Sequence, residues 1–254
     1  MFSRILTIIN WFLRRKGIIN PGMFRIWFFA SMSCVIVFFT GCTSNEIGYN
    51  KEVNPDAIYF DYNIWGDEEG GNVTVKLQYR FGGPNGTTLV LEEPAKVEFD
   101  GKLLEVDSSR MNGAWYEISK PVKDFDGRHW ITYTDINKKQ YKEEFDFNFF
   151  SLRKEPPKEI KRGDLIFELD GLEPKDYVRL LLTDTSFYSR GIDRLDTVRN
   201  GRVIITRQDL DNLKNGPVSL EFYCEDEKTL KQATREGGRL SISYGLKRVF
   251  ELKN

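Results

Sequence analysis

Residues that could carry chemistry are scarce in this chain, which has a single histidine, His129, among its 254 residues. A catalytic histidine needs a nucleophile and an orienting partner, and no sequence pattern supplies them. Cys224 lies in an apolar stretch, where a thiol is more often inert and buried than nucleophilic. We therefore expect both side chains to be structural and the protein not to be an enzyme, with a hydrolase as a remote alternative.

Two acidic runs, Asp67-Glu68-Glu69 and Glu225-Asp226-Glu227, could offer oxygen ligands to Ca²⁺. Neither run has the spaced carboxylates of an EF-hand loop, and acidic turns are usually just solvated. Zinc sites need several Cys or His ligands, which the chain lacks, and no phosphate-binding or dinucleotide-binding loop occurs. The sequence therefore predicts no metal site and no cofactor.

Three tryptophans could stack on the rings of a carbohydrate, because an aromatic face offers apolar contact beside polar groups. Trp115 and Trp130 lie in alternating stretches and are predicted to be core residues. Trp65 stands beside a Gly-rich turn. It is therefore the candidate for an exposed ligand contact.

The segment from Met23 to Cys42 has the layout of a secretory signal peptide. One basic residue, Arg25, precedes an apolar run from Ile26 to Phe39, and a polar segment follows Cys42. A transmembrane helix is the alternative, but a span needs about 20 apolar residues, and this run is shorter and contains two serines. We predict a signal peptide over residues 1–41.

The tetrapeptide Phe39-Thr40-Gly41-Cys42 resembles the lipobox of bacterial lipoproteins, with Phe39 where leucine is usual. The resemblance implies that Cys42 is lipidated and becomes the new N-terminus. The protein would then be exported and lipid-anchored to the bacterial envelope, at the outer membrane, with the periplasmic or surface face left open. Of the other cysteines, Cys34 lies in the signal, so Cys224 has no partner for an intrachain disulfide.

The first 22 residues precede this signal-like segment. They contain a second apolar patch at 5–13, the basic run Arg14-Arg15-Lys16 and a Pro21-Gly22 breaker. Either translation starts at Met23, or these residues are a long N-terminal region of the precursor. The sequence leaves both alternatives open.

The net charge argues against a nucleic-acid partner. The chain has 37 basic and 38 acidic residues, and residues 1–41 hold five of the basic and none of the acidic ones, so the chain from Cys42 has a net charge of −6. Nucleic-acid backbones require clustered Lys and Arg. The remaining length suits one large or two small domains.

Short alternating stretches separated by turn signals predict an all-β fold. Every second residue from Val73 to Tyr79 is apolar, which is the period of a half-buried strand. Asp100-Gly101 predicts a tight hairpin. Strands are predicted in the first half at 57–62, 72–81, 97–99, 102–104, 114–119, 129–134 and 142–149.

The stretch from Phe125 to Asp135 has a Gly-x-His entry, an alternating strand and a closing Asp. It resembles the penultimate strand of bacterial immunoglobulin-like repeats, and the hairpin at 100–102 and the segment 113–118 fit the order of that family. The resemblance covers about 57–150 and implies an immunoglobulin-like β-sandwich in which His129 packs and hydrogen-bonds locally. A resemblance of fold says little about ligands.

Pro156-Pro157 marks the predicted linker, because two prolines cannot continue a strand ladder. Beyond it, Asn200-Gly201 predicts a tight turn, Thr206 with Asp209 predicts a capped short helix, and 185–198 is predicted to be a long loop. Further strands are predicted at 164–169, 177–182, 202–206, 218–224, 239–244 and 247–252. The domains predicted are a flexible tether at 42–56, an immunoglobulin-like antiparallel sandwich at 57–152, a linker at 153–160 and a second antiparallel sandwich at 161–254.

Taken together, these patterns favour a non-enzymatic lipoprotein that acts as a scaffold or binding accessory at the cell envelope. Its partners would be the membrane, through the lipid on Cys42, and envelope proteins or glycans. The alternative is a carbohydrate-binding module of a glycan-uptake system, which an exposed aromatic patch around Trp65 would support. The ligand and the oligomeric state are left open.

Overall fold

The computed structural model describes residues 45–173, 176–186 and 189–254, and these described residues belong to one compact unit. The fold is all-β, as the sequence predicted. The predicted signal segment and Cys42 lie outside the described residues, so their roles stay predictions. In the part of the chain that is described, no helix is long and apolar enough to span a bilayer.

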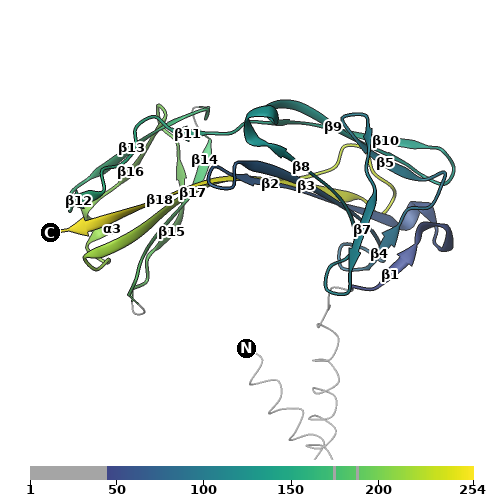
Figure 1. Cartoon of the computed structure of the whole chain (residues 1–254), viewed down its shortest axis with the longest axis horizontal. Coiled ribbons are helices and arrows are strands. Elements are labelled where there is room, and N and C mark those ends of the chain that lie inside the picture. Colours follow the sequence, from purple (N-terminus) through teal and green to yellow (C-terminus); the bar gives the residue numbers. More distant parts are fainter. Residues whose placement is uncertain (1–44, 174–175, 187–188) are drawn as a thin grey trace, which may run out of the picture. The chain divides into compact units, whose positions relative to one another are not determined.

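One large sheet forms the base of the unit, and its path runs β1-β4-β3-β2-β18-β17-β14-β15 (Figure 1). Strands β8 and β12 extend it by pairing with β3 and β18, and β7 pairs with β8. Its strands are β1 (Ile47–Tyr49), β2 (Ile58–Asp67), β3 (Asn72–Phe81), β4 (Thr87–Val90), β7 (Val106–Ser109), β8 (Gly113–Pro121), β12 (Glu159–Lys161), β14 (Tyr177–Asp184), β15 (Ile192–Thr197), β17 (Gly216–Thr229) and β18 (Gly238–Lys253).

Two smaller sheets pack on this base, and each closes one sandwich. The first contains β5 (Lys96–Phe99), β6 (Lys102–Leu103), β9 (Gly127–Thr134) and β10 (Gln140–Phe147), and the second contains β11 (Ser151–Leu152), β13 (Leu165–Asp170) and β16 (Arg202–Ile205). The short helices are η2 (Asn50–Glu52), η3 (Pro55–Ala57), η4 (Val122–Asp124) and α3 (Arg207–Leu210).

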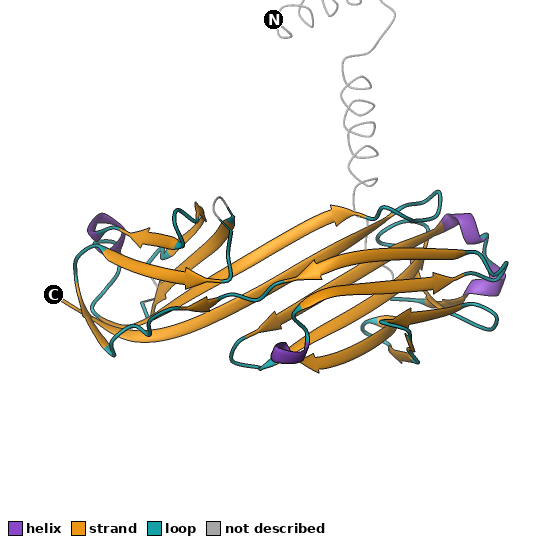
Figure 2. Cartoon of the chain, turned by 90° about the horizontal axis from the view of Figure 1, so that it is seen from above, coloured by secondary structure: helices purple, strands orange, loops and turns teal. Residues whose placement is uncertain are grey.

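The hairpin of β17 and β18 is shared by both sandwiches (Figure 2). Residues 238–245 of β18 pair in parallel with β2, while β17 pairs with β18 over its whole length and with β14 near its start. Because side chains alternate along a strand, Leu240 and Tyr244 share a face with Leu246 and Phe250, and all four are buried. One face of the hairpin therefore supplies apolar residues to both cores.

The core of the first sandwich is aromatic. Phe60 on the base lies 4.9 Å from Tyr133 on the small sheet, measured between ring centroids, and 5.3 Å from Tyr79. These rings meet at steep angles, which is a favourable arrangement for aromatic pairs. In the second sandwich, Phe167 and Phe222 make the same kind of contact across the two layers, at 5.7 Å.

Several local predictions are confirmed. Asp100 and Gly101 both have positive φ, as do Asn200 and Gly201, so both turns adopt the backbone that a two-residue hairpin requires. Thr206 and Asp209 form a reciprocal capping box at the start of α3.

The structure also departs from the sequence-based expectations. The predicted loop at 185–198 contains β15, whose charged residues fit a sheet edge. The two strands predicted on either side of Gly245 are one strand, β18, because the missing side chain of Gly245 leaves room for the Tyr223 ring. The segment 47–57, predicted to be mostly flexible tether, forms β1, η2 and η3, and the buried Asn50 accepts a hydrogen bond from the Glu92 amide.

The predicted domain boundary falls in a region with cross-connections. β11 lies before Pro156-Pro157 yet pairs with β13, and β12 begins within the predicted linker, at Glu159, and pairs with β18. The chain passes from one small sheet to the other at 148–150. Whether the halves fold separately stays a prediction.

Fragments provide the test. A fragment of residues 57–155 lacks the part of β18 that pairs with β2, so the edge of its base sheet and the side chains facing Leu240 would be exposed to water. We expect it to melt at a clearly lower temperature than the chain of residues 43–254, or not to fold, as measured by calorimetry and amide NMR dispersion. Cooperative melting of 57–155 at the temperature of the chain of residues 43–254, together with a cooperative melt of 158–254, would instead support two separable sandwiches.

Candidate functional site

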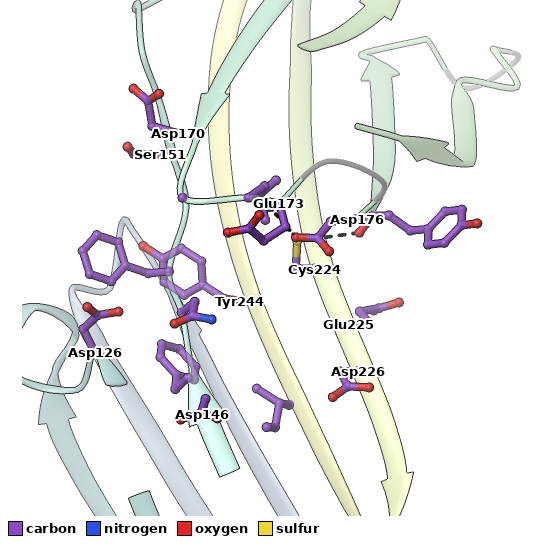
Figure 3. Close-up of a pocket in the computed structure, with 17 residues that line it drawn as sticks. Asp126, Asp146, Ser151, Asp170, Glu173, Asp176, Cys224, Glu225, Asp226 and Tyr244 are labelled. Atoms are coloured by element: carbon purple, nitrogen blue, oxygen red, sulfur yellow. Dashed lines mark hydrogen bonds between the residues drawn. The ribbon is translucent and has the colours of Figure 1, made fainter. Parts of the chain in front are cut away.

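A cleft of about 1040 Å³ opens between the two small sheets (Figure 3). Ile242 and Tyr244 of β18, with Cys224 and Asp226 of β17, line its base. The end of β10 and the following chain form one wall, and the start of β14 with the turn after β13 forms the other. The cleft exists because the shared hairpin is longer than the sheets that cover it.

Aromatic contacts fix the wall that follows β10. Tyr244 lies 6.0 Å from Phe147, 6.3 Å from Phe149 and 5.6 Å from Phe150, between ring centroids. Gly171, in the turn after β13, allows this turn to approach the wall that follows β10, because a Cβ on Gly171 would lie 2.5 Å from the Phe149 carbonyl oxygen. The φ of Gly171 is +90°, which glycine adopts readily. The crossing between the sandwiches is therefore tightly packed.

Acidic side chains dominate the rim of the cleft, and four of them are paired with basic residues that surround it. The pairs are Asp146 with Arg128 at 3.3 Å, Asp170 with Arg153 at 2.5 Å, Glu225 with Arg179 at 3.7 Å and Asp226 with Lys228 at 3.7 Å. The hydrogen bond from Arg153 lowers the pKa of Asp170. A carboxyl whose pKa is lowered in this way is ionised at neutral pH, so Asp170 is not placed to serve as a proton donor.

Cys224, at the base of the cleft, is a poor nucleophile. Burial, and then the nearby Asp176 carboxylate, raise the pKa of its thiol to about 12. Its Sγ donates a weak hydrogen bond to the Tyr177 carbonyl at 3.7 Å. Because the thiolate is the reactive form, this environment fits the structural role predicted for Cys224.

His129 lies outside the cleft, in the core of the first sandwich. Its Nδ1 is 2.9 Å from Asp100 Oδ2 and its Nε2 is 2.9 Å from the Phe125 carbonyl oxygen, so both nitrogens are engaged. The imidazole also stacks on the Phe125 ring at 4.1 Å. This is the local packing and hydrogen bonding that the sequence predicted.

Trp65 is exposed, with 41% of its surface accessible, on the outer face of the large sheet. Its strand neighbours in the register are Thr74 on β3 and Ser243 on β18. Small hydroxyl side chains thus flank the indole on both sides. The structure therefore leaves Trp65 available as a ligand contact, as the sequence suggested.

The prediction for the other two tryptophans is wrong, because neither is a core residue. Trp130 is 37% exposed, and Trp115 is half-buried with the Lys76 ammonium 4.6 Å from its ring centre. Ala114 and Tyr116 take the inward positions on β8. The alternation of each strand could have shown this, since one face cannot hold adjacent residues.

The acidic runs take part in ion pairs and a turn. Glu68 pairs with Arg248 at 2.6 Å, Glu227 pairs with Arg239 at 3.8 Å, and the Gly70 amide donates to the Asp67 side chain. Over the described ranges, no group of three or more His, Cys, Asp or Glu side chains is arranged to hold a metal ion.

Sequence reasoning missed the cleft because its lining comes from separate parts of the chain. Tyr244 and Ile242 alternate with polar residues in an ordinary strand pattern, and Phe149 follows a strand that ends at Phe147. The aromatic run at the end of the first half could have indicated the cleft. It contains Phe145, Phe147, Phe149 and Phe150, and the last two pack on Tyr244 beyond the core of the first sandwich.

Comparisons with known proteins identify no family. No family model matches the chain, and no curated protein matches it. Solved structures similar to it include Dpr11 IG1 bound to DIP-gamma, with 12% identity, a TM-score of 0.23 and coverage of 74% of this chain and 98% of that one. DIP-gamma IG1+IG2 has 10% identity, a TM-score of 0.23 and coverage of 74% and 94%.

A third similar structure is SGBP-B of the Bacteroides ovatus mixed-linkage glucan utilization locus, in complex with a mixed-linkage heptasaccharide. It has 10% identity and a TM-score of 0.20, and the match covers 85% of this chain and 67% of that one. At these TM-scores the likenesses carry no argument about function. The all-β assignment rests on the strands of the chain itself.

The contacts of Asp100 predict a pH-dependent contribution to stability. Burial alone would raise its pKa, but hydrogen bonds from Lys120 and His129 outweigh this effect and lower the pKa. A carboxyl with a lowered folded-state pKa stabilises the protein above its unfolded pKa of about 4 and loses that contribution as the pH falls through the folded value. Asp100→Asn tolerates the positive φ of this turn, and we expect it to lower the unfolding free energy by about 1–3 kcal/mol at pH 7.

Urea unfolding at pH 7 and pH 3 measures this effect, and the difference from wild type should shrink at pH 3. Asp146→Asn is the matched control, because the pair with Arg128 is exposed and should contribute little. Equal stability of Asp100→Asn and wild type at pH 7 would contradict the assignment.

Proposed function

We propose that the protein is a non-enzymatic binding or accessory protein, lipid-anchored through Cys42 at the bacterial cell envelope. The cleft between the small sheets supports the binding role, because concave sites that combine aromatic lining with polar groups are where proteins usually bind ligands. The lipobox-like tetrapeptide supports the anchor.

The state of the chemistry-bearing residues agrees with a role in binding. Both ring nitrogens of His129 are engaged within a core, and the thiol of Cys224 has a pKa near 12. A general base must reach the proton that it abstracts, and a thiol nucleophile must ionise. Neither residue is placed to do so.

The anchor is tested by Cys42→Ser. The substitution removes the thioether that would carry the lipid, so we expect the protein to leave the membrane fraction and to lose acyl labelling in the producing bacterium. Cys224→Ser is the control and should leave both unchanged, since its thiol lies in the folded domain. Membrane retention and acyl labelling of Cys42→Ser at wild-type levels would rule out this anchor.

Carbohydrate binding at Trp65 is the second candidate function. The exposed indole between Thr74 and Ser243 combines an aromatic face with hydroxyl groups, which suits the apolar face and polar edge of a sugar ring. The outer face around Trp65 also carries Asn63 and Ser241, which are partners in the register.

A panel of soluble glycans tests this candidate by titration calorimetry. For a glycan that binds, Trp65→Ala should weaken the affinity at least about tenfold, or ~1.4 kcal/mol. Tyr177→Ala is the matched control, because Tyr177 is an exposed aromatic residue of the cleft. The reverse pattern would place the glycan in the cleft, and a panel with no binding would remove the carbohydrate function.

A further inference from the structure

We propose that a surface made of Ile47, Tyr49 and Met111 contacts the same membrane that holds the lipid on Cys42. This inference rests on the anchoring proposed above and adds a non-covalent contact to it. It would set the orientation of the domain on the bilayer, which a lipid tether alone leaves free.

The first argument is the length of the tether. Ile47 is five residues after Cys42, and an extended chain spans at most 3.3–3.6 Å per residue, or about 17 Å here. β1 begins at Ile47 and pairs with β4, so the folded domain starts at that residue. A domain held this closely must present some part of its surface to the bilayer.

The second argument is that two segments meet at this point through Thr88. The Thr88 amide and its Oγ1 both donate to the Glu46 carbonyl, at 3.0 and 2.8 Å, and Oγ1 accepts from the Ala114 amide at 2.8 Å. A Cβ on Gly113 would lie 2.2 Å from Thr88 Oγ1, so the first residue of β8 packs closely against the Thr88 side chain.

The turn between β7 and β8 is held beside β1 by these contacts (Figure 1). Gln78 Nε2 donates to the Asn112 carbonyl at 2.9 Å, which adds a second attachment. Met111 lies at the tip of the turn. Its position relative to β1 is therefore set by hydrogen bonds on both sides of Thr88.

The third argument is the exposure of apolar side chains here. Met111 is 81% exposed, Tyr49 is 46% exposed and Ile47 is 41% exposed. Ile47 and Tyr49 share one face of β1, while Gly48 faces Leu89. Apolar residues gathered on a surface commonly mark interaction sites, and tyrosine is enriched at the membrane–water interface.

The charges around this surface are balanced. Lys51 and Arg110 are basic, Glu46 and Glu52 are acidic, and all four are exposed. Electrostatic attraction to anionic lipids would need an excess of basic residues. We therefore expect the contact to be apolar and insensitive to lipid charge and to salt.

Three side chains alone do not hold a protein on a bilayer, but the tether lowers the entropic cost of forming the contact. A short tether makes the second contact intramolecular, at an effective concentration in the millimolar range. The contact should accordingly form in the lipidated protein and be absent from the same domain free in solution.

The experiment uses the full-length protein, lipidated in the producing bacterium and reconstituted into neutral phosphatidylcholine vesicles. Met111→Cys is labelled with an environment-sensitive fluorophore in a Cys224→Ala background, and quenching by lipids with brominated acyl chains is measured. Leu195→Cys is the matched control, because Leu195 is 69% exposed on β15, at the opposite end of the sheet path. Circular dichroism verifies that both labelled proteins are folded.

We expect several-fold stronger quenching at position 111 than at position 195, unchanged by anionic lipid or by added salt. Vesicle flotation reports the anchor separately from the contact. Flotation with equal quenching at the two positions would overturn the membrane contact and leave the anchor standing. Failure to float would overturn the anchor and this inference with it.

Discussion

The strict alternation of side chains along β17 and β18 is the constraint on which this fold depends. A hairpin has one inner face, and here that face supplies Leu240 and Tyr244 to the first sandwich and Phe222 and Phe250 to the second. Both small sheets must therefore pack on the same side of the base. The space left between them becomes a cleft, and its base is a continuous hydrogen-bonded ladder.

The far end of the hairpin is fixed to the first sandwich by several hydrogen bonds. Thr234 Oγ1 donates to the Ile58 carbonyl at 2.6 Å, and the Lys231 amide donates to the buried carboxylate of Glu143 at 2.8 Å. Glu143 takes an inward position on β10 among apolar residues. Burying a carboxylate is unfavourable unless it is hydrogen-bonded, so this contact makes one position of the hairpin tip strongly preferred.

Sequence patterns predicted the parts of the fold that depend on neighbouring residues. Alternation located β3 and β10, positive-φ turn residues located the hairpin at Asp100-Gly101, and a capping pattern located α3. The parallel pairing of β18 with β2 could not be predicted, because it joins residues about 180 positions apart. Gly245 was interpreted as a break for the same reason, since its space is filled by Tyr223 from another strand.

The same distinction explains the candidate site. Trp65 was identified from the sequence because exposure beside a Gly-rich turn is a local property, whereas the cleft depends on how far β17 and β18 extend past their covering sheets. Within the described residues, three passes of the chain cross between the sandwiches, namely residues 148–150 and the two strands of the hairpin. Two of these passes are hydrogen-bonded to each other throughout. The width of the cleft is therefore set by the ladder and by the packing of Phe150 on Tyr244, and the Pro156-Pro157 segment lies outside that crossing.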